Sequence, residues 1–83
     1  MNTAITAPAN ATNEQILVEI AQIAALVNAY EENGQSAFGL VDDNRFEALV
    51  EEAGLRGLDE THADAFGSAC SGDLSNTVRH LNG

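Results

Sequence analysis

The fold is decided by residues 12–33, TNEQILVEIAQIAALVNAYEEN, where the helical signals of the chain are most continuous. Thr12 and Gln15 match a capping box at a helix start, and Gly34 supplies a stop after the run. Apolar residues recur at spacings of four and three, which is the pattern of one helix face. This stripe comprises Ile16, Ile20, Ile23, Val27 and Tyr30. We therefore expect one long helix over about 12–33.

The predicted long helix is apolar over most of its circumference. Leu17, Val18 and Leu26 fall outside the stripe, and several alanines dilute the polar side. Such a helix must be covered on several sides, either by its own chain or by a second copy. Because an 83-residue chain has a small core, we expect a homodimer that associates through the stripe.

Three shorter helices are predicted downstream of a glycine-containing connector at 34–43. The first runs over about 43–53 and is closed by Gly54, with Asn44 and Glu47 as a cap-like pair. The next starts near Asp59 or Thr61, and the last covers about 73–81.

Residues 1–11 are small and polar, so they are predicted to be a flexible tail. The expected fold is all-α. It is a small bundle of about four helices in a single domain over 12–83, with a compact three-helix part over about 43–82.

Residues 46–81 resemble the three-helix ubiquitin-associated (UBA-like) domains. Ala53-Gly54-Leu55 stands where that family has a Met-Gly-Phe type turn, and Ala69-Cys70-Ser71-Gly72-Asp73-Leu74 resembles its run from the second helix into the third. The connection over 54–63 is about two residues longer than is usual there, and Thr77 replaces a common alanine. The resemblance implies an apolar patch for a ubiquitin-like or peptide partner, with candidates Leu55, Leu74 and Val78, whereas Leu81 is either part of it or core.

The charge balance limits the class of partner. The chain has 13 acidic residues against 3 arginines and lysines, for a net charge of −10. Phosphate contacts need Lys and Arg, so we expect no direct binding to nucleic acid or to an anionic membrane. The sequence shows no signal-peptide pattern and no apolar run of membrane-spanning length. We expect a cytoplasmic protein.

No catalytic or metal-binding pattern accompanies the two histidines, His62 and His80. Asp59, Glu60, His62 and Asp64 crowd together but do not match a calcium loop. Cys70 lies at an apolar helix spacing and is predicted to be a small core residue. We therefore expect no enzymatic activity, no metal and no cofactor.

Acidic residues are densest in the middle of the chain. Asp43, Glu47 and Glu51 follow one another at i, i+4, so they form a ladder along one helix face with steps of about 6 Å. Two interpretations stay open: a solvated face that only keeps the chain soluble, or a surface for a strongly basic partner. The candidate partner-binding face comprises Asp43, Glu47, Glu51, Glu52, Asp59, Glu60 and Asp64.

These features favour a non-enzymatic protein that presents an acidic helical surface to a basic protein. In length, acidity, helix content and lack of catalytic motifs the chain resembles small phage-encoded inhibitors of bacterial defence, such as anti-CRISPR proteins and nucleic-acid mimics. If the chain is phage-encoded, the expected compartment is the host cytoplasm. The alternative is a UBA-like or dimeric adaptor that docks through an apolar patch. A third hypothesis is a binder of a small anionic signal molecule that uses helix N-termini and Arg45, Arg56 or Arg79.

Overall fold

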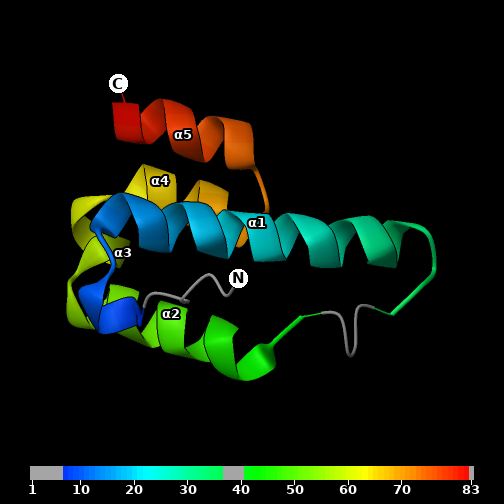
Figure 1. The fold of residues 1–83 in the computed structure, drawn as a ribbon. Coiled ribbons are helices and arrows are strands. Elements are labelled where there is room, and N and C mark those ends of the chain that lie inside the picture. The colour runs from blue at the N-terminus through cyan, green and yellow to red at the C-terminus, as the bar shows by residue number, and fades with distance from the viewer. Residues whose placement is uncertain (1–6, 37–40, 83) are drawn as a thin grey trace, which may run out of the picture.

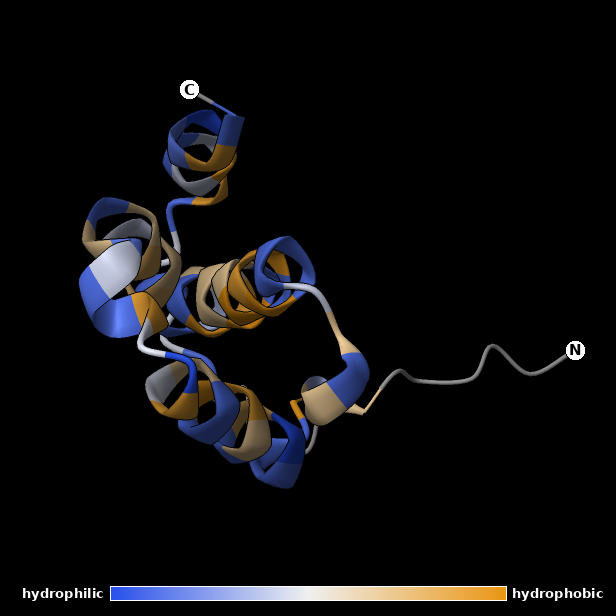
Figure 2. Cartoon of the chain, turned by 90° about the vertical axis from the view of Figure 1, so that its left-hand side faces the viewer, coloured by the Kyte–Doolittle hydropathy of each residue, from blue (hydrophilic) through white to orange (hydrophobic). Residues whose placement is uncertain are grey.

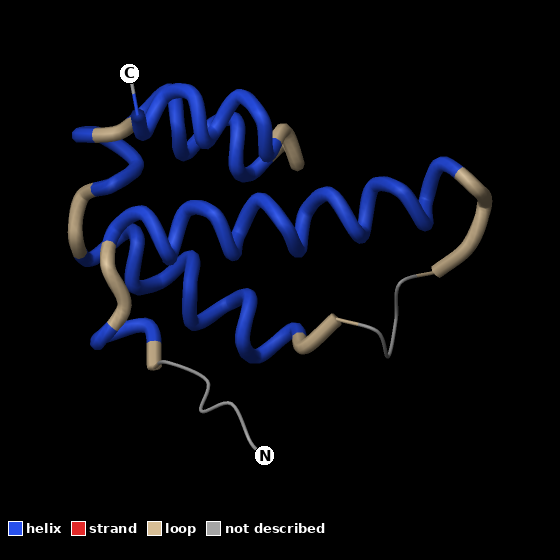
Figure 3. The backbone as a smooth tube through the Cα atoms, turned by 45° about the horizontal axis from the view of Figure 1, so that its top comes forward, coloured by secondary structure: helices blue, strands red, loops and turns tan. Residues whose placement is uncertain are grey.

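A computed structural model describes residues 7–36 and 41–82, which form five α-helices and no strand (Figures 1 and 3). A single 3₁₀ turn precedes the α-helices. The elements are η1 (Pro8–Asn10), α1 (Asn13–Glu32), α2 (Asp43–Leu55), α3 (Leu58–Thr61), α4 (Ala63–Cys70) and α5 (Leu74–Asn82). The all-α prediction is confirmed. The helix expected after Asp59 is split in two, because the backbone leaves helical geometry at His62 (φ −126°, ψ 46°).

The long helix α1 has the predicted boundaries. The Thr12 hydroxyl accepts a hydrogen bond from the Gln15 amide at 3.1 Å, and the Gln15 side chain accepts one from the Thr12 amide at 2.9 Å. After Glu32, Gly34 takes a left-handed conformation (φ 71°) that few other residues adopt easily, so the helix ends there.

Helix α1 lies in the middle of the molecule. It packs on α2 on one side and on α4 and α5 on the other, as Figures 1 and 2 show. Within 43–82, α3 contacts both α2 and α4, and α4 packs on α5, while α1 contacts α2, α4 and α5. This position also explains why α1 is apolar over most of its circumference: its own chain covers it on two sides.

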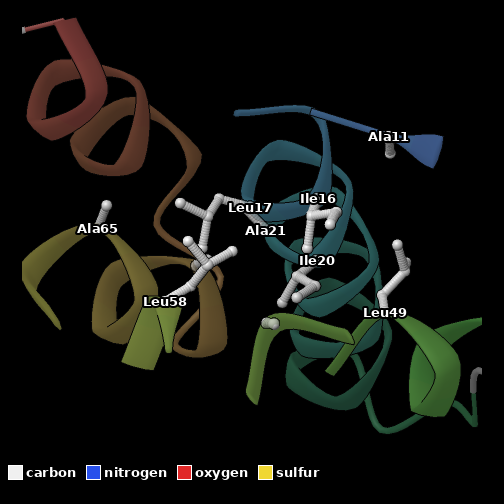
Figure 4. Close-up of a cluster of buried hydrophobic side chains, with 10 residues drawn as sticks. Ala11, Ile16, Leu17, Ile20, Ala21, Leu49, Leu58 and Ala65 are labelled. Carbon is white, nitrogen blue, oxygen red and sulfur yellow. The ribbon is translucent and has the colours of Figure 1, made fainter. Parts of the chain in front are cut away.

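The core is built around the first three turns of α1 (Figure 4). Ile16 and Ile20 lie on the side of Leu49, whereas Leu17 points toward Leu58. All five of these side chains are buried. Ile16 and Ile20 are therefore not available for the predicted self-association, because both side chains are already fully buried within the chain.

The turn between α4 and α5 packs closely against α1. A Cβ atom on Gly72 would lie 2.7 Å from the Asn28 side-chain nitrogen and 3.1 Å from the Ala25 backbone nitrogen. Gly72 also has a φ of +83°, which disfavours any side chain. The backbone at Ala24 and Ala25, together with the Asn28 side chain, thus forms the surface against which this turn packs.

Two boundaries of α2 differ from the prediction. Asp42, not Asn44, caps the start, where its carboxylate accepts a hydrogen bond from the Arg45 amide at 3.1 Å. Gly54 stays helical, and the turn is made by Gly57 (φ 71°).

Residues 7–11, which were predicted to belong to a flexible tail, are held in place by the rest of the chain. Residues 1–6 lie outside the described part of the chain, but Pro8–Asn10 form a turn and Ala11 is buried. The cause is Arg56, whose guanidinium donates to the carbonyl oxygens of Ala11 at 2.7 Å and Pro8 at 2.9 Å. Nothing in the local sequence of 7–11 indicates this contact, because Arg56 is 45 residues beyond Ala11 in the chain.

Candidate interaction surface

The predicted ladder on α2 is exposed. Asp43, Glu47 and Glu51 all lie at the surface, while Leu49 and Ala53 on the opposite side of the helix are buried. Helical spacing therefore places three carboxylates in one solvent-facing row. Like charges at i, i+4 repel each other, so this row costs the helix a few tenths of a kcal/mol per pair.

The other exposed candidates lie on α3 and α4. Asp59 and Glu60 lie exposed in the first turn of α3, and Asp64 lies exposed in the first turn of α4. Helix α3 follows α2 at one end of the bundle (Figure 1). We define the acidic face as these six exposed residues: Asp43, Glu47, Glu51, Asp59, Glu60 and Asp64.

Glu52 does not belong to the acidic face. Its carboxylate oxygen lies 2.8 Å from the Arg56 Nε, and its side chain is only 20% exposed. The charge of Glu52 is therefore balanced within the chain, which corrects its predicted role in binding a partner.

Two of the three arginines are held by the protein itself. The Arg45 guanidinium makes two parallel hydrogen bonds to the Glu19 carboxylate, from Nε and from Nη2, each 2.7 Å long. Hydrogen bonding to the Glu19 side chain is the main cause of the raised pKa of Arg45. Arg56 is divided between Glu52 and the carbonyls of residues 8–11. Only Arg79 is exposed, on α5, where it donates to Asn76 Oδ1 at 2.7 Å.

The two arginines Arg45 and Arg56 are paired with carboxylates of the same chain and are largely covered, whereas most of the other carboxylates are exposed to water. The same bonds weaken the hypothesis of a small-anion binder, because two of its three candidate cations, Arg45 and Arg56, already hold carboxylates. The Arg45–Glu19 pair joins residues 26 apart on different helices, so no sequence spacing indicates it.

The three residues of the predicted apolar patch, Leu55, Leu74 and Val78, do not form one continuous surface. Leu55 is 77% exposed at the end of α2, and Val78 is 38% exposed on α5. Leu74 is half-buried and packs against the core. Because α2 and α5 lie on opposite sides of α1, the structure does not join Leu55 to the other two residues in one patch.

The structure also places the side chains considered for catalysis. His62 and His80 are exposed and line one hollow of about 340 Å³, which Glu60 and Asp64 also line. In the described part of the chain, no three His, Cys, Asp or Glu side chains gather closely enough to hold a metal ion.

Cys70 is exposed, so its predicted core position is wrong. Partial burial nevertheless raises the pKa of its thiol.

None of the helices within 7–36 and 41–82 has both the length and the apolarity needed to cross a membrane. Comparison of the chain with models of protein families, with curated proteins and with solved structures finds no match.

Proposed function

We propose that this protein is a non-enzymatic binding protein whose acidic face docks on a strongly basic protein surface. The observation that carries the proposal is the division of charge between inside and outside. Arg45 and Arg56 are paired within the chain, whereas Asp43, Glu47 and Glu51 stand exposed in a row on α2.

The physical advantage of such a face is long-range attraction. A surface of one sign raises the rate of encounter with a partner of the opposite sign, and it suppresses unsuitable partners. A row of carboxylates on a rigid helix can occupy a cleft that otherwise holds phosphates. We propose a nucleic-acid-binding complex as the target, with the protein acting as an inhibitor of the phage-encoded anti-CRISPR type.

The test compares two variants that change the total charge equally. Glu47→Lys with Glu51→Lys reverses the ladder, and Glu14→Lys with Glu32→Lys reverses two exposed residues of α1 outside the acidic face. The partner is captured from host lysate, purified, and titrated at low and high salt.

We expect the ladder variant to lose at least about tenfold in affinity, while the α1 variant keeps most of it. Wild-type binding should also weaken strongly with salt, since salt screens exposed charges. Binding that survives both high salt and the ladder reversal would show that the acidic face is not the interface.

An adaptor that docks through an apolar patch is the second candidate, and the exposure of Leu55 favours it. Because Leu55 is already largely in water, Leu55→Ser should leave the fold intact. Loss of a salt-insensitive interaction in this variant would support the adaptor. For the dimeric form, the available part of the stripe is Ile23, Val27 and Tyr30, which are half-buried, and light scattering over a range of concentrations tests it.

A further inference from the structure

An apolar hollow of about 280 Å³ opens between the second half of α1, the start of α2 and the end of α4. Ile23 and Val27 of α1, Phe46 of α2 and Cys70 of α4 line it. Three of these side chains are only partly buried: Ile23, Val27 and Phe46. The hollow therefore exposes apolar surface that could contact another molecule. We refer to this hollow as the α1–α2 groove.

The edge of the α1–α2 groove is acidic. Asp43, the first residue of the exposed ladder, lines the groove and also lines an adjoining hollow of about 520 Å³. Val27 belongs to both hollows, and Glu31 lines the second. The described residues that line them include no arginine or histidine. An apolar floor thus continues directly into exposed carboxylates.

The size and charge of the α1–α2 groove select its occupant. Its volume lies just below the range of about 300–1,000 Å³ that is common for small-molecule pockets, so it suits one large side chain better than a free ligand. A second copy of the chain would bring its own net charge of −10 to an already acidic edge, and repulsion opposes that contact.

We propose that the α1–α2 groove binds a basic amphipathic helix of a partner protein. One large apolar side chain of that helix enters between Val27 and Phe46, while its lysines or arginines meet Asp43 and Glu31. Helices of this kind bind apolar grooves through a few anchor side chains, and the flanking charges set their orientation. This inference rests on the proposed function and deepens it by assigning an anchoring site beside the acidic face.

The experiment uses two synthetic helix-forming peptides with the same number of lysines and a fluorescent label at one end. The first has leucine on its apolar face, and the second has alanine there. We expect the leucine peptide to bind at least about tenfold more tightly, as measured by fluorescence anisotropy. It should also slow the alkylation of Cys70, the single cysteine of the chain, because this residue lines the groove.

Two matched variants locate the binding site. Val27→Asn places a polar group in the groove, whereas Val78→Asn makes the same change on α5, at a residue that does not line the groove. Only Val27→Asn should abolish the preference for leucine over alanine. Circular dichroism checks that both variants are folded. If Val27→Asn unfolds, protection of Cys70 in the wild-type chain still decides the question.

The outcomes separate the two proposals. Equal, salt-sensitive binding of both peptides without protection of Cys70 would overturn the groove and support the acidic face. A leucine preference that persists in Val27→Asn would also overturn the groove, as would peptide-dependent dimers seen by light scattering. If neither peptide binds at low salt, both proposals are wrong.

Discussion

The side-chain amide of Asn28 on α1 donates a hydrogen bond to the carbonyl oxygen of Ser71, 43 residues later, at a distance of 3.0 Å. This bond fixes the α4–α5 turn on the long helix. Gly72 follows immediately and comes so close to α1 that it leaves no room for a side chain. The position of α5 therefore depends on the Asn28–Ser71 hydrogen bond and on the close approach of Gly72, and helical periodicity in the sequence predicts neither of them.

Gly72→Ala should destabilise the protein by at least about 2 kcal/mol, because a positive φ disfavours a Cβ atom and the new atom would meet Asn28 and the Ala25 backbone. The matched control is Gly54→Ala, since Gly54 is helical and has no atom near its Cβ position. That change should stabilise by about 0.5–1 kcal/mol. Urea unfolding of both variants measures the difference, and equal effects would show that the close approach at Gly72 is unimportant.

Arg56→Gln should cost about 2 kcal/mol of stability and release the turn at Pro8–Asn10. The guanidinium binds Glu52 and the carbonyls of Pro8 and Ala11 at once, and charge-assisted hydrogen bonds of this kind are stronger than neutral ones. Arg56→Lys should recover little, since one ammonium group cannot reproduce the planar fork. Urea unfolding gives the stability, and limited proteolysis reports cleavage near residue 10. Resistance to cleavage equal to that of the wild type would contradict the role of Arg56.

Glu47→Lys should stabilise the protein by about 1 kcal/mol even as it weakens partner binding. Glu47 stands at i, i+4 between Asp43 and Glu51, so the change replaces two repulsive pairs with two attractive ones. Glu47→Gln, which only removes the repulsion, should give about half the effect. Thermal or urea unfolding measures this. A loss of stability would mean that the row of carboxylates is not strained by its own repulsion.

Cys70 should make stability depend on pH in the alkaline range. Burial raises the pKa of this thiol above its ordinary value of 9.0, so the folded chain holds the proton more tightly than the unfolded chain. The resulting stabilisation is complete below pH 9.0 and disappears as the pH rises through the folded-state pKa. Unfolding measured over this range should show a decline that Cys70→Ser lacks. Alkylation of the folded chain should also require a higher pH than alkylation in urea.

The candidate surface was predictable where it depends on neighbours along one helix. The spacing of Asp43, Glu47 and Glu51 requires that they share a face, and the burial of Leu49 turns that face outward. The ion pair that excludes Glu52 from the acidic face was harder to predict, although Arg56 lies four residues after Glu52. The α1–α2 groove was not predictable, because it joins side chains of three helices whose relative positions depend on long-range packing.

The sequence by itself determined the all-α class, the extent of α1 and the strongly negative charge, since caps, helical periodicity and composition act over a few residues. Only the tertiary structure decided what covers α1. It placed α2 on one side and α4 with α5 on the other, so Ile16 and Ile20 became core and not a surface for a second copy. It also turned Arg45 toward Glu19 and Arg56 toward the N-terminal turn. Those choices follow from close packing and from pairing charges far apart in the chain, and local patterns do not encode either one.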